Sequence, residues 1–205
     1  MFLKTIGALH GHMVFSRRAL VLGSAIGALF PVGANVLDIG TGDGTIAEHW
    51  TRGRPDVSVE GVDVLVRPKA KIPVRAFDGL NLPFPDRSFD VVTLVDVLHH
   101  ARDQVRLLSE AARVARQFVI IKDHIPSSRL DWATLAVMDW VGNAPHGVSL
   151  PYNYLSSRQW SDLFRKAKLD VETTESKLGL YPFPLNYLFG RKLHFISRLR
   201  KSVER

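Results

Sequence analysis

The segment VLDIGTGDGTIA (residues 36–47) constrains the fold more than any other part of the chain. An apolar run typical of a buried strand ends at Asp38, glycines follow at positions 40, 42 and 44, and a helical pattern begins near Thr45. Glycines let a backbone approach a ligand closely, and the free amide groups of a helix N-terminus favour polar or anionic groups. The segment therefore predicts a strand, loop and helix that bind a small ligand. A dinucleotide fingerprint would carry its third glycine at position 45, so the spacing favours a different ligand.

Short apolar, β-branched runs alternate with helical patterns over the first two thirds of the chain. Val105, Leu108, Ala112 and Ala115 mark one stripe of a helix. Such alternation is typical of a parallel sheet covered by helices on both faces, which is an α/β fold. Strands are expected at residues 36–39, 57–64, 72–77, 89–95 and 118–122.

The last third of the chain changes pattern. Apolar residues at helical spacing predict a helix over 130–141, and Ser156 with Gln159 predicts a capping box before a second helix. Residues 170–176 and 193–199 have the composition of two strands, separated by an aromatic segment that contains prolines. We expect these strands to close the sheet as an antiparallel hairpin.

Composition narrows the class of protein. With 205 residues, of which 46% are hydrophobic and 23% charged, the chain suits one compact domain. No apolar stretch reaches the roughly 18 to 20 residues that span a bilayer. Cysteine is absent, which excludes disulfides, thiolate metal sites and cysteine nucleophiles and fits a cytoplasmic protein. Most of the net charge of +7 comes from residues 186–205, which carry six basic side chains and one acidic side chain.

Two further acids stand at the ends of the next two predicted strands. Asp63 can accept hydrogen bonds from both hydroxyls of a ribose, as an acid at this position does in dinucleotide folds. Asp78 follows the third strand, where the carboxyl edge of the sheet would bring it beside Asp38 and Asp63 and let it hold an adenine amino group. Three acids at successive strand ends therefore indicate an adenosine-containing cofactor.

These residues carry a resemblance to a known family. VLDIGTGDG, GVDV and the block from RAFDGLNLPFPDRSFDVV to VLHH resemble the class I S-adenosylmethionine-dependent methyltransferases, in the branch that includes quinone and small-molecule enzymes. The similarity is close over residues 35–123. It implies a Rossmann-like three-layer sandwich with a seven-stranded, mostly parallel sheet in the order 3-2-1-4-5-7-6, whose last strand is antiparallel. It also implies S-adenosylmethionine as the cofactor.

The resemblance also implies how the chain is divided. We expect one methyltransferase domain over residues 1–205. Its parts would be an N-terminal helical cap (1–34), a cofactor-binding core (35–125), a substrate lid with strand six (126–192), and the last strand with a basic tail (193–205).

Residue by residue, the resemblance assigns the cofactor site. The first strand and the glycine loop would line the methionine end of the cofactor, Asp63 would hold the ribose, and Asp78 the adenine. The adenine ring would lie between Phe77 and Val64. Asp96, after the fourth strand, stands where the family often has a small residue and would face the methionine moiety or the sulfonium. The predicted cofactor-binding set is Asp38, Gly40, Thr41, Gly42, Gly44, Asp63, Val64, Phe77, Asp78, Gly79 and Asp96.

Methyl transfer to an oxygen atom or an acidic carbon is helped by a general base, and histidine is the first candidate because its unperturbed pKa lies near neutrality. His124 ends the fifth strand with Asp123 beside it, and His100 follows the fourth strand. Both lie at the edge where open α/β sheets bind ligands. His124, His100 and Asp123 are therefore the predicted catalytic set, and a structural, helix-capping role is the alternative for His100.

Aromatic residues concentrate after the fifth and sixth strands. Loops of this composition often carry function, and aromatic side chains suit a flat or lipophilic acceptor such as an aromatic ring or a prenylated quinone. The alternative is that these residues pack the lid and one another. The predicted substrate-binding residues are Trp140, His146, Tyr152, Asn153, Tyr154 and Tyr181.

Other functions fit the sequence less well. No metal site is expected, because Asp96, His99 and His100 form the only compact group of candidate ligands and adjacent histidines on a helix point away from each other. A serine hydrolase would need a GxSxG motif, which is absent. Two alternatives stay open beside a soluble small-molecule enzyme. One is a non-catalytic binding or assembly protein, and the other is an enzyme that methylates RNA, or a lipid or quinone at a membrane surface with residues 193–205 as a weak anchor.

Overall fold

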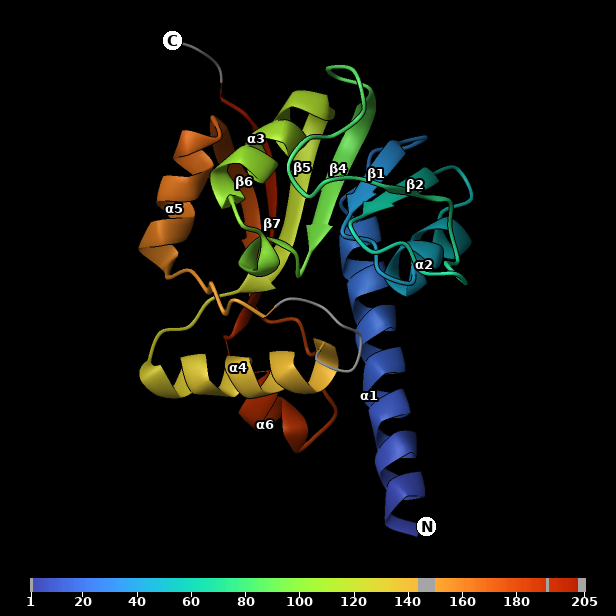
Figure 1. Ribbon diagram of the computed structural model, residues 1–205, viewed down its shortest axis with the longest axis vertical. Coiled ribbons are helices and arrows are strands. Elements are labelled where there is room, and N and C mark those ends of the chain that lie inside the picture. The colour runs from blue at the N-terminus through green and yellow to red at the C-terminus, as the bar shows by residue number, and fades with distance from the viewer. Residues whose placement is uncertain (1, 144–149, 191, 203–205) are drawn as a thin grey trace.

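The computed structural model describes residues 2–143, 150–190 and 192–202, with the side chains of the first helix from Phe15 onward. Seven strands form one sheet in the order β3-β2-β1-β4-β5-β7-β6 (Figure 1). Neighbouring strands are parallel except that β7 runs antiparallel to both β5 and β6. The predicted strand order and the antiparallel last strand are confirmed. The strands are β1 (Asn35–Ile39), β2 (Ser58–Asp63), β3 (Val74–Ala76), β4 (Phe89–Val95), β5 (Ala115–His124), β6 (Leu169–Glu175) and β7 (His194–Lys201).

Helices cover both faces of the sheet, which gives three layers (Figure 1). Adjacent residues of a strand point to opposite faces. Val36 of β1 accordingly packs in one buried apolar cluster with α1 and α2, whereas Leu37 packs in another with α3 and α5. The helices are α1 (Phe2–Gly27), α2 (Thr45–Gly53), α3 (Gln104–Val114), α4 (Arg129–Asn143), α5 (Ser157–Lys166) and α6 (Leu185–Phe189), with a single 3-10 turn η1 (Leu98–His100).

Local sequence signals explain where several helices begin. The predicted capping box is present at the start of α5, where the Ser156 and Gln159 side chains each bond the other residue's backbone N–H. At the start of α3, the Asp103 carboxylate accepts a hydrogen bond from the backbone N–H of Arg106. These caps fix the two helices that cover one face of the sheet.

The first helix, α1, packs its C-terminal half against α2. The two helices approach closely at Gly23, where an added Cβ would lie 2.5 Å from the Cβ of His49. The N-terminal half of α1 projects beyond the rest of the molecule (Figure 1). One helix, α1, therefore occupies most of the N-terminal segment (1–34) that was expected to be helical.

The C-terminal strand lies inside the sheet, and its apolar side chains are buried. Residues 194–201 form β7, which lies between β5 and β6. Phe195, Ile196 and Leu199 are buried in the core, and Arg198 pairs with Glu172 of β6. These apolar side chains are therefore covered within the sheet, and a weak membrane anchor at residues 193–205 stays a prediction. Within the described ranges, no helix is both long and apolar enough to cross a membrane.

Candidate active site

The order of the strands reverses between β1 and β4, and the carboxyl ends of the parallel strands meet at one edge of the sheet. Open α/β sheets bind ligands at this position. The loop from β1 to α2 carries Gly40, Gly42 and Gly44, which all have left-handed φ angles of 70°, 63° and 76°. A Cβ on Gly40 would lie 2.4 Å from a methyl group of Val97, whereas a Cβ on Gly42 would meet no described atom within 4 Å. The loop is thus packed at its first glycine and open at its second.

Asp38 lies at the end of β1 and is 4% exposed. Its Oδ1 accepts a hydrogen bond from the Thr93 hydroxyl of β4 at 2.6 Å, and the Thr41 hydroxyl donates to its carbonyl oxygen at 2.7 Å. Burial raises the pKa of Asp38 to about 7, because the ionised carboxylate loses its hydration. A cationic ligand group beside this carboxyl would favour its ionised form.

Asp63, at the end of β2, fixes the shape of the glycine loop. Its Oδ2 accepts the backbone N–H of Gly42 at 2.7 Å, and its Oδ1 accepts the N–H of Leu65 at 2.8 Å. Each oxygen keeps a further lone pair that can accept another hydrogen bond. The neighbouring Val64 is 65% exposed, and its side chain lies close to Gly79, where an added Cβ would be 3.1 Å from Val64 Cγ1. Through its two hydrogen bonds, the Asp63 carboxylate therefore joins the glycine loop to the end of β2.

Asp78, the third predicted acid, lies in a different environment from the other two. Its carboxylate accepts hydrogen bonds from the backbone N–H groups of Leu80 and Asn81 and from the Asn81 side-chain amide, at 2.6 to 2.8 Å. These hydrogen bonds lower the pKa of Asp78 to about 2. Phe77, the residue before it, packs partly buried against the core cluster that holds α3 and α5. Asp78 thus stabilises the turn after β3 in addition to any contact with a ligand.

Asp96, directly after β4, forms ion pairs with two basic side chains. Lys122 of β5, whose side chain is fully buried, donates to Oδ1, and Arg18 of α1 donates to Oδ2. Burial opposes ionisation, but the charges of Lys122 and Arg18 hold the pKa of Asp96 well below its ordinary value. The backbone of Asp96 is left-handed, with φ of 58°, which Asp tolerates better than most residues. The residue predicted to face the methionine moiety therefore belongs to a charged cluster.

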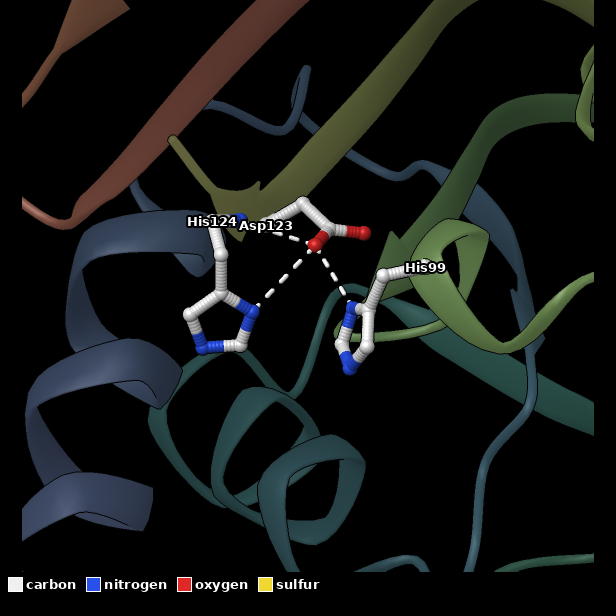
Figure 2. A group of neighbouring side chains, drawn as sticks. All are labelled: His99, Asp123 and His124. Carbon is white, nitrogen blue, oxygen red and sulfur yellow. Dashed lines mark hydrogen bonds and ion pairs between the residues drawn. The ribbon is translucent and has the colours of Figure 1, made fainter. Parts of the chain in front are cut away.

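His99, Asp123 and His124 form a buried group at the carboxyl ends of β4 and β5, and Figure 2 shows the carboxylate between the two rings. Asp123 Oδ1 lies 2.7 Å from His99 Nδ1 and 3.3 Å from His124 Nδ1, and it accepts the backbone N–H of His124 at 2.8 Å. Burial opposes the His99 imidazolium, but the Asp123 carboxylate overcomes this and raises the pKa of His99 to about 10. Burial and the charge of Lys122 lower the pKa of His124 to about 4. Their surroundings therefore shift the pKa values of the two histidines in opposite directions.

A second group connects η1 to α4. The Nε2 atoms of His100 and His99 lie 3.4 Å and 3.7 Å from Asp139 Oδ1, and the Tyr154 hydroxyl donates to Asp139 Oδ2 at 3.0 Å. The two imidazole centroids are 4.1 Å apart. The expectation that the adjacent histidines point away from each other is therefore wrong. η1 is a single turn, and both rings reach toward the same carboxylate on α4.

Two of the predicted substrate-binding tyrosines contact histidine rings. Tyr154 is 8% exposed, and its ring centroid is 5.4 Å from that of His99. Tyr181, 9% exposed, has its centroid 5.9 Å from that of His194. Both tyrosines are therefore in ring contact with histidines at the carboxyl edge of the sheet.

The other predicted substrate-binding residues are spread over a wider area. Tyr152 lies beside Tyr154, with the ring centroids 6.4 Å apart, and the carbonyl oxygen of Asn153 accepts a hydrogen bond from the Gln104 side chain. Trp140 is on α4 and is 60% exposed. His146 lies outside the described residues.

Sequence reasoning missed several members of the charged cluster. The sequence does indicate a charge partner for Lys122. A lysine inside the apolar run of β5 is buried with the strand and then needs a carboxylate beside it. His99 belongs to the group in which no metal site is expected, and the sequence around Arg18 gives no sign of its partner Asp96. The sequence around Asp139 and around His194 does not indicate that either residue joins the charged cluster. His194 Nδ1 lies 3.4 Å from Lys122 Nζ, and its Nε2 bonds the carbonyl oxygen of Phe189.

Comparison with known proteins identifies related chains. A family model described as a methyltransferase domain matches residues 14–174. A demethylmenaquinone methyltransferase of Symbiobacterium thermophilum is 32% identical over 187 residues, which cover 74% of each chain. The 27-O-demethylrifamycin SV methyltransferase of Amycolatopsis mediterranei is 34% identical over 97 residues, or 41% of this chain and 35% of that one.

Similarity to solved structures extends over nearly the whole fold. A chain from the complex of the Haloferax volcanii Trm112 methyltransferase activator with a methyltransferase superposes with a TM-score of 0.71 at 17% identity, covering 92% of this chain and 91% of that one. At this identity the superposition shows the fold. Among curated relatives, the match spans 35% of the rifamycin enzyme and 64% of the demethylmenaquinone methyltransferase of Thermobifida fusca.

Proposed function

The chain belongs to the methyltransferase domain family, within the class I S-adenosylmethionine-dependent enzymes of the quinone-like branch, and we propose that it methylates a small molecule. The methyl group comes from S-adenosylmethionine and passes to an oxygen or carbon atom of an aromatic or lipophilic acceptor. The bound donor supplies a methyl group already made electrophilic by its sulfonium. The protein then mainly has to align the acceptor and exclude water.

The glycine loop carries this proposal. Three left-handed glycines at the strand reversal bring the backbone to the sheet edge, and the open space at Gly42 suits a ligand that lies against the loop. The buried carboxylates of Asp38 and Asp63 flank it. Asp38 would hold the methionine end, where the cofactor carries an ammonium group, together with Gly40, Thr41, Gly42 and Gly44. Asp63 would accept the ribose hydroxyls.

The adenine end is proposed to lie beyond Asp63. Val64 is exposed and Phe77 partly buried, so both have surface to offer the ring. Asp78 and Gly79 would border the exocyclic amino group. Because the Asp78 carboxylate already supports the turn of residues 80–81, its contribution to cofactor affinity should be smaller than that of Asp63.

The acceptor is proposed to lie at the carboxyl ends of β4 and β5. His124 is the candidate proton acceptor, because it ends β5 and 11% of its side chain remains exposed. Asp123 is fully buried and is therefore a positioning residue that holds the rings of His99 and His124. Tyr154 and Tyr181 lie beside the histidine rings and would form an apolar wall, with Trp140, Tyr152 and Asn153 nearer the surface.

Exposed apolar side chains on α4 support a lipophilic acceptor. Four of them are 60% to 65% exposed, although helices on a protein surface normally present polar residues there. They are Leu130, Val137, Trp140 and Val141. Phe183 and Tyr187, around α6, are 85% and 80% exposed. Apolar patches of this kind mark sites that bind ligands, lipids or partners.

The same surface favours a second candidate, an enzyme that reaches a lipid or quinone at a membrane surface through α4. Wild-type protein should then sediment with anionic lipid vesicles, and the double variant Trp140→Ser/Val141→Ser should not. Val32→Ser is the matched control, because Val32 is 91% exposed but lies before β1, at the opposite edge of the sheet. Equal sedimentation of all three proteins, or of none, would contradict the membrane candidate.

The main proposal is tested by titration calorimetry with S-adenosylmethionine, S-adenosylhomocysteine and NADH. We expect micromolar binding of both sulfur compounds and no binding of NADH. Phenols, quinones and lipids are then screened for methyl acceptance with labelled donor. If neither sulfur compound binds, alone or with these acceptors present, the cofactor assignment fails. A non-catalytic binding or assembly role would then account for the fold better.

A further inference from the structure

The site contains more histidine and carboxylate groups than methyl transfer requires. We propose that His99 Nε2, His100 Nε2 and Asp139 Oδ1 form a three-ligand site for a divalent transition-metal ion at the carboxyl ends of β4 and β5. The ligands come from η1 and α4, two elements that the sequence separates widely. Ion binding at this site does not depend on the methyl donor.

The spacing of the three atoms matches a coordination sphere. Zinc binds imidazole nitrogen and carboxylate oxygen at about 2.0–2.2 Å, so two ligands of a tetrahedral ion lie about 3.3 Å apart. The two nitrogens are 3.4 Å and 3.7 Å from Asp139 Oδ1, and all three atoms lie within 4.8 Å of one another. The three atoms surround a point that an ion can occupy.

Neighbouring side chains hydrogen-bond the proposed ligands and orient them, as in known metal sites. The other ring nitrogen of His99, Nδ1, is 2.7 Å from the Asp123 carboxylate, which is the arrangement of carboxylate, histidine and metal common in metalloproteins. This leaves His99 Nε2 facing Asp139, buried and without a hydrogen-bond partner among the residues that the structure describes. Tyr154 donates to Asp139 Oδ2, which holds that carboxylate with Oδ1 toward the histidines.

The neighbouring group in Figure 2 is a poorer candidate for the ligand set. His99, Asp123 and His124 also bring three potential ligand atoms together. However, Asp123 Oδ1 lies only 2.7 Å from His99 Nδ1 and also accepts the backbone N–H of His124. That oxygen is engaged in hydrogen bonds, and the first distance is shorter than two ligands of one zinc ion adopt. Asp123 therefore supports the site from behind.

Ligand chemistry defines the class of ion. Two imidazoles and one carboxylate suit zinc, iron, cobalt or nickel, whereas magnesium and calcium prefer oxygen ligands throughout. Three protein ligands leave at least one coordination position open, as in catalytic rather than structural zinc sites. In the proposed reaction this position could take an oxygen atom of the acceptor. That role rests on the proposed function, but ion binding itself does not.

The test is metal binding by the intact, tag-free chain after removal of bound ions with a chelator. Titration calorimetry with Zn²⁺ and visible absorption with Co²⁺ should each show one ion per chain, with cobalt bands that indicate nitrogen and oxygen ligands. His100→Gln and Asp139→Asn should each weaken binding about 100-fold or more. Tyr154→Phe should weaken it about tenfold, because it loosens the carboxylate. His49→Gln is the matched control, since His49 is a histidine of α2 outside the cluster, and it should bind as the wild type does.

The proposal is overturned if the wild type binds neither ion, or if His100→Gln binds both ions as tightly as His49→Gln does. Thermal unfolding is followed for every variant. Should Asp139→Asn fail to fold, His100→Gln decides, because the His100 side chain is 16% exposed and tolerates replacement better. Neither methyl donor nor acceptor is present in this test. A negative result therefore leaves the proposed methyl transfer intact, and absence of cofactor binding leaves the metal site intact.

Discussion

At the carboxyl ends of β1 and β2, the carboxylates of Asp38 and Asp63 are held by a threonine hydroxyl and backbone N–H groups. At the ends of β4 and β5, by contrast, Asp96 is held by Lys122 and Arg18, and further carboxylates face histidines. Both regions belong to one edge of one sheet. The first uses neutral donors and leaves a loop open, whereas the second packs opposite charges together in the interior.

The difference separates two tasks. A cofactor-binding loop needs backbone groups and short side chains, because the ligand brings most of the functional groups. A buried charge cluster holds its own groups in fixed positions and excludes water, which strengthens each interaction inside it. We expect mutations in the first region to affect cofactor affinity, and mutations in the second to affect stability, turnover and ion binding.

The largest expected effect is on cofactor affinity in the first region. Gly42→Val should weaken S-adenosylhomocysteine binding by at least about 1,000-fold, or about 4 kcal/mol, because the branched side chain fills the open side of the loop. Asp63→Ala should have a comparable effect. Gly33→Val is the matched control, since Gly33 also has a left-handed φ of 70° and open space around an added Cβ but lies outside the loop. Calorimetry that finds equal affinity in the two valine variants would remove the loop from the binding site.

The next effect is on stability in the second region. Asp96→Asn should lower the free energy of unfolding by about 3 kcal/mol, because the buried ammonium of Lys122 loses the carboxylate it bonds. Asparagine keeps the size of the side chain and tolerates the left-handed backbone. The double variant Asp96→Asn/Lys122→Met should recover most of the loss in urea denaturation. In the first region, Asp63→Asn should lower the free energy of unfolding by only about 1 kcal/mol. A double variant less stable than the single one would contradict the charge argument.

A smaller effect is expected on turnover. His124→Ala should leave S-adenosylhomocysteine affinity unchanged and lower kcat about 100-fold, which is typical for removal of a general base. The measurement needs an acceptor from the methylation screen. His49→Ala serves as the control, because His49 is on α2 and outside the cluster. If kcat is the same in both variants, His124 has no part in the reaction.

Much of the first region could be predicted from sequence, because its determinants are local. The glycines and Asp38 lie within a few residues of each other in the loop and its strand, and β4 has the predicted bounds, 89–95. The order of the strands came from the resemblance to a family. The capping box of α5 is equally local, since both of its members lie within one turn.

The second region could not be predicted in the same way, because its contacts join distant segments. Asp139 of α4 meets His99 and His100 of η1, and Arg18 of α1 meets Asp96 after β4. The rule that adjacent residues of an α-helix point away from each other does not apply to a single 3-10 turn. The side chains of His99 and His100 therefore point in directions that the sequence did not indicate. A buried charge pair is visible in sequence only where, as for Lys122, one partner interrupts an apolar strand.

The smallest expected effect is a proton released at Asp38 when the cofactor binds. Its carboxyl, faced by Thr93, Thr41 and Asp63, has a pKa near 7 because of burial, so it is largely protonated at pH 6. The ammonium group of S-adenosylhomocysteine would favour the ionised form, so binding should release a fraction of one proton and strengthen as pH rises from 5 to 7, by less than tenfold per unit. The stability of the ligand-free protein should change in the opposite direction. Because the folded-state pKa of Asp38 is raised above 3.8, the free energy of unfolding should fall as the pH rises from about 4 to 7. Calorimetry in buffers of different ionisation enthalpy measures the release, and Asp38→Asn should abolish it. Equal proton release by the variant and the wild type would assign the proton to another group and move the ammonium away from Asp38.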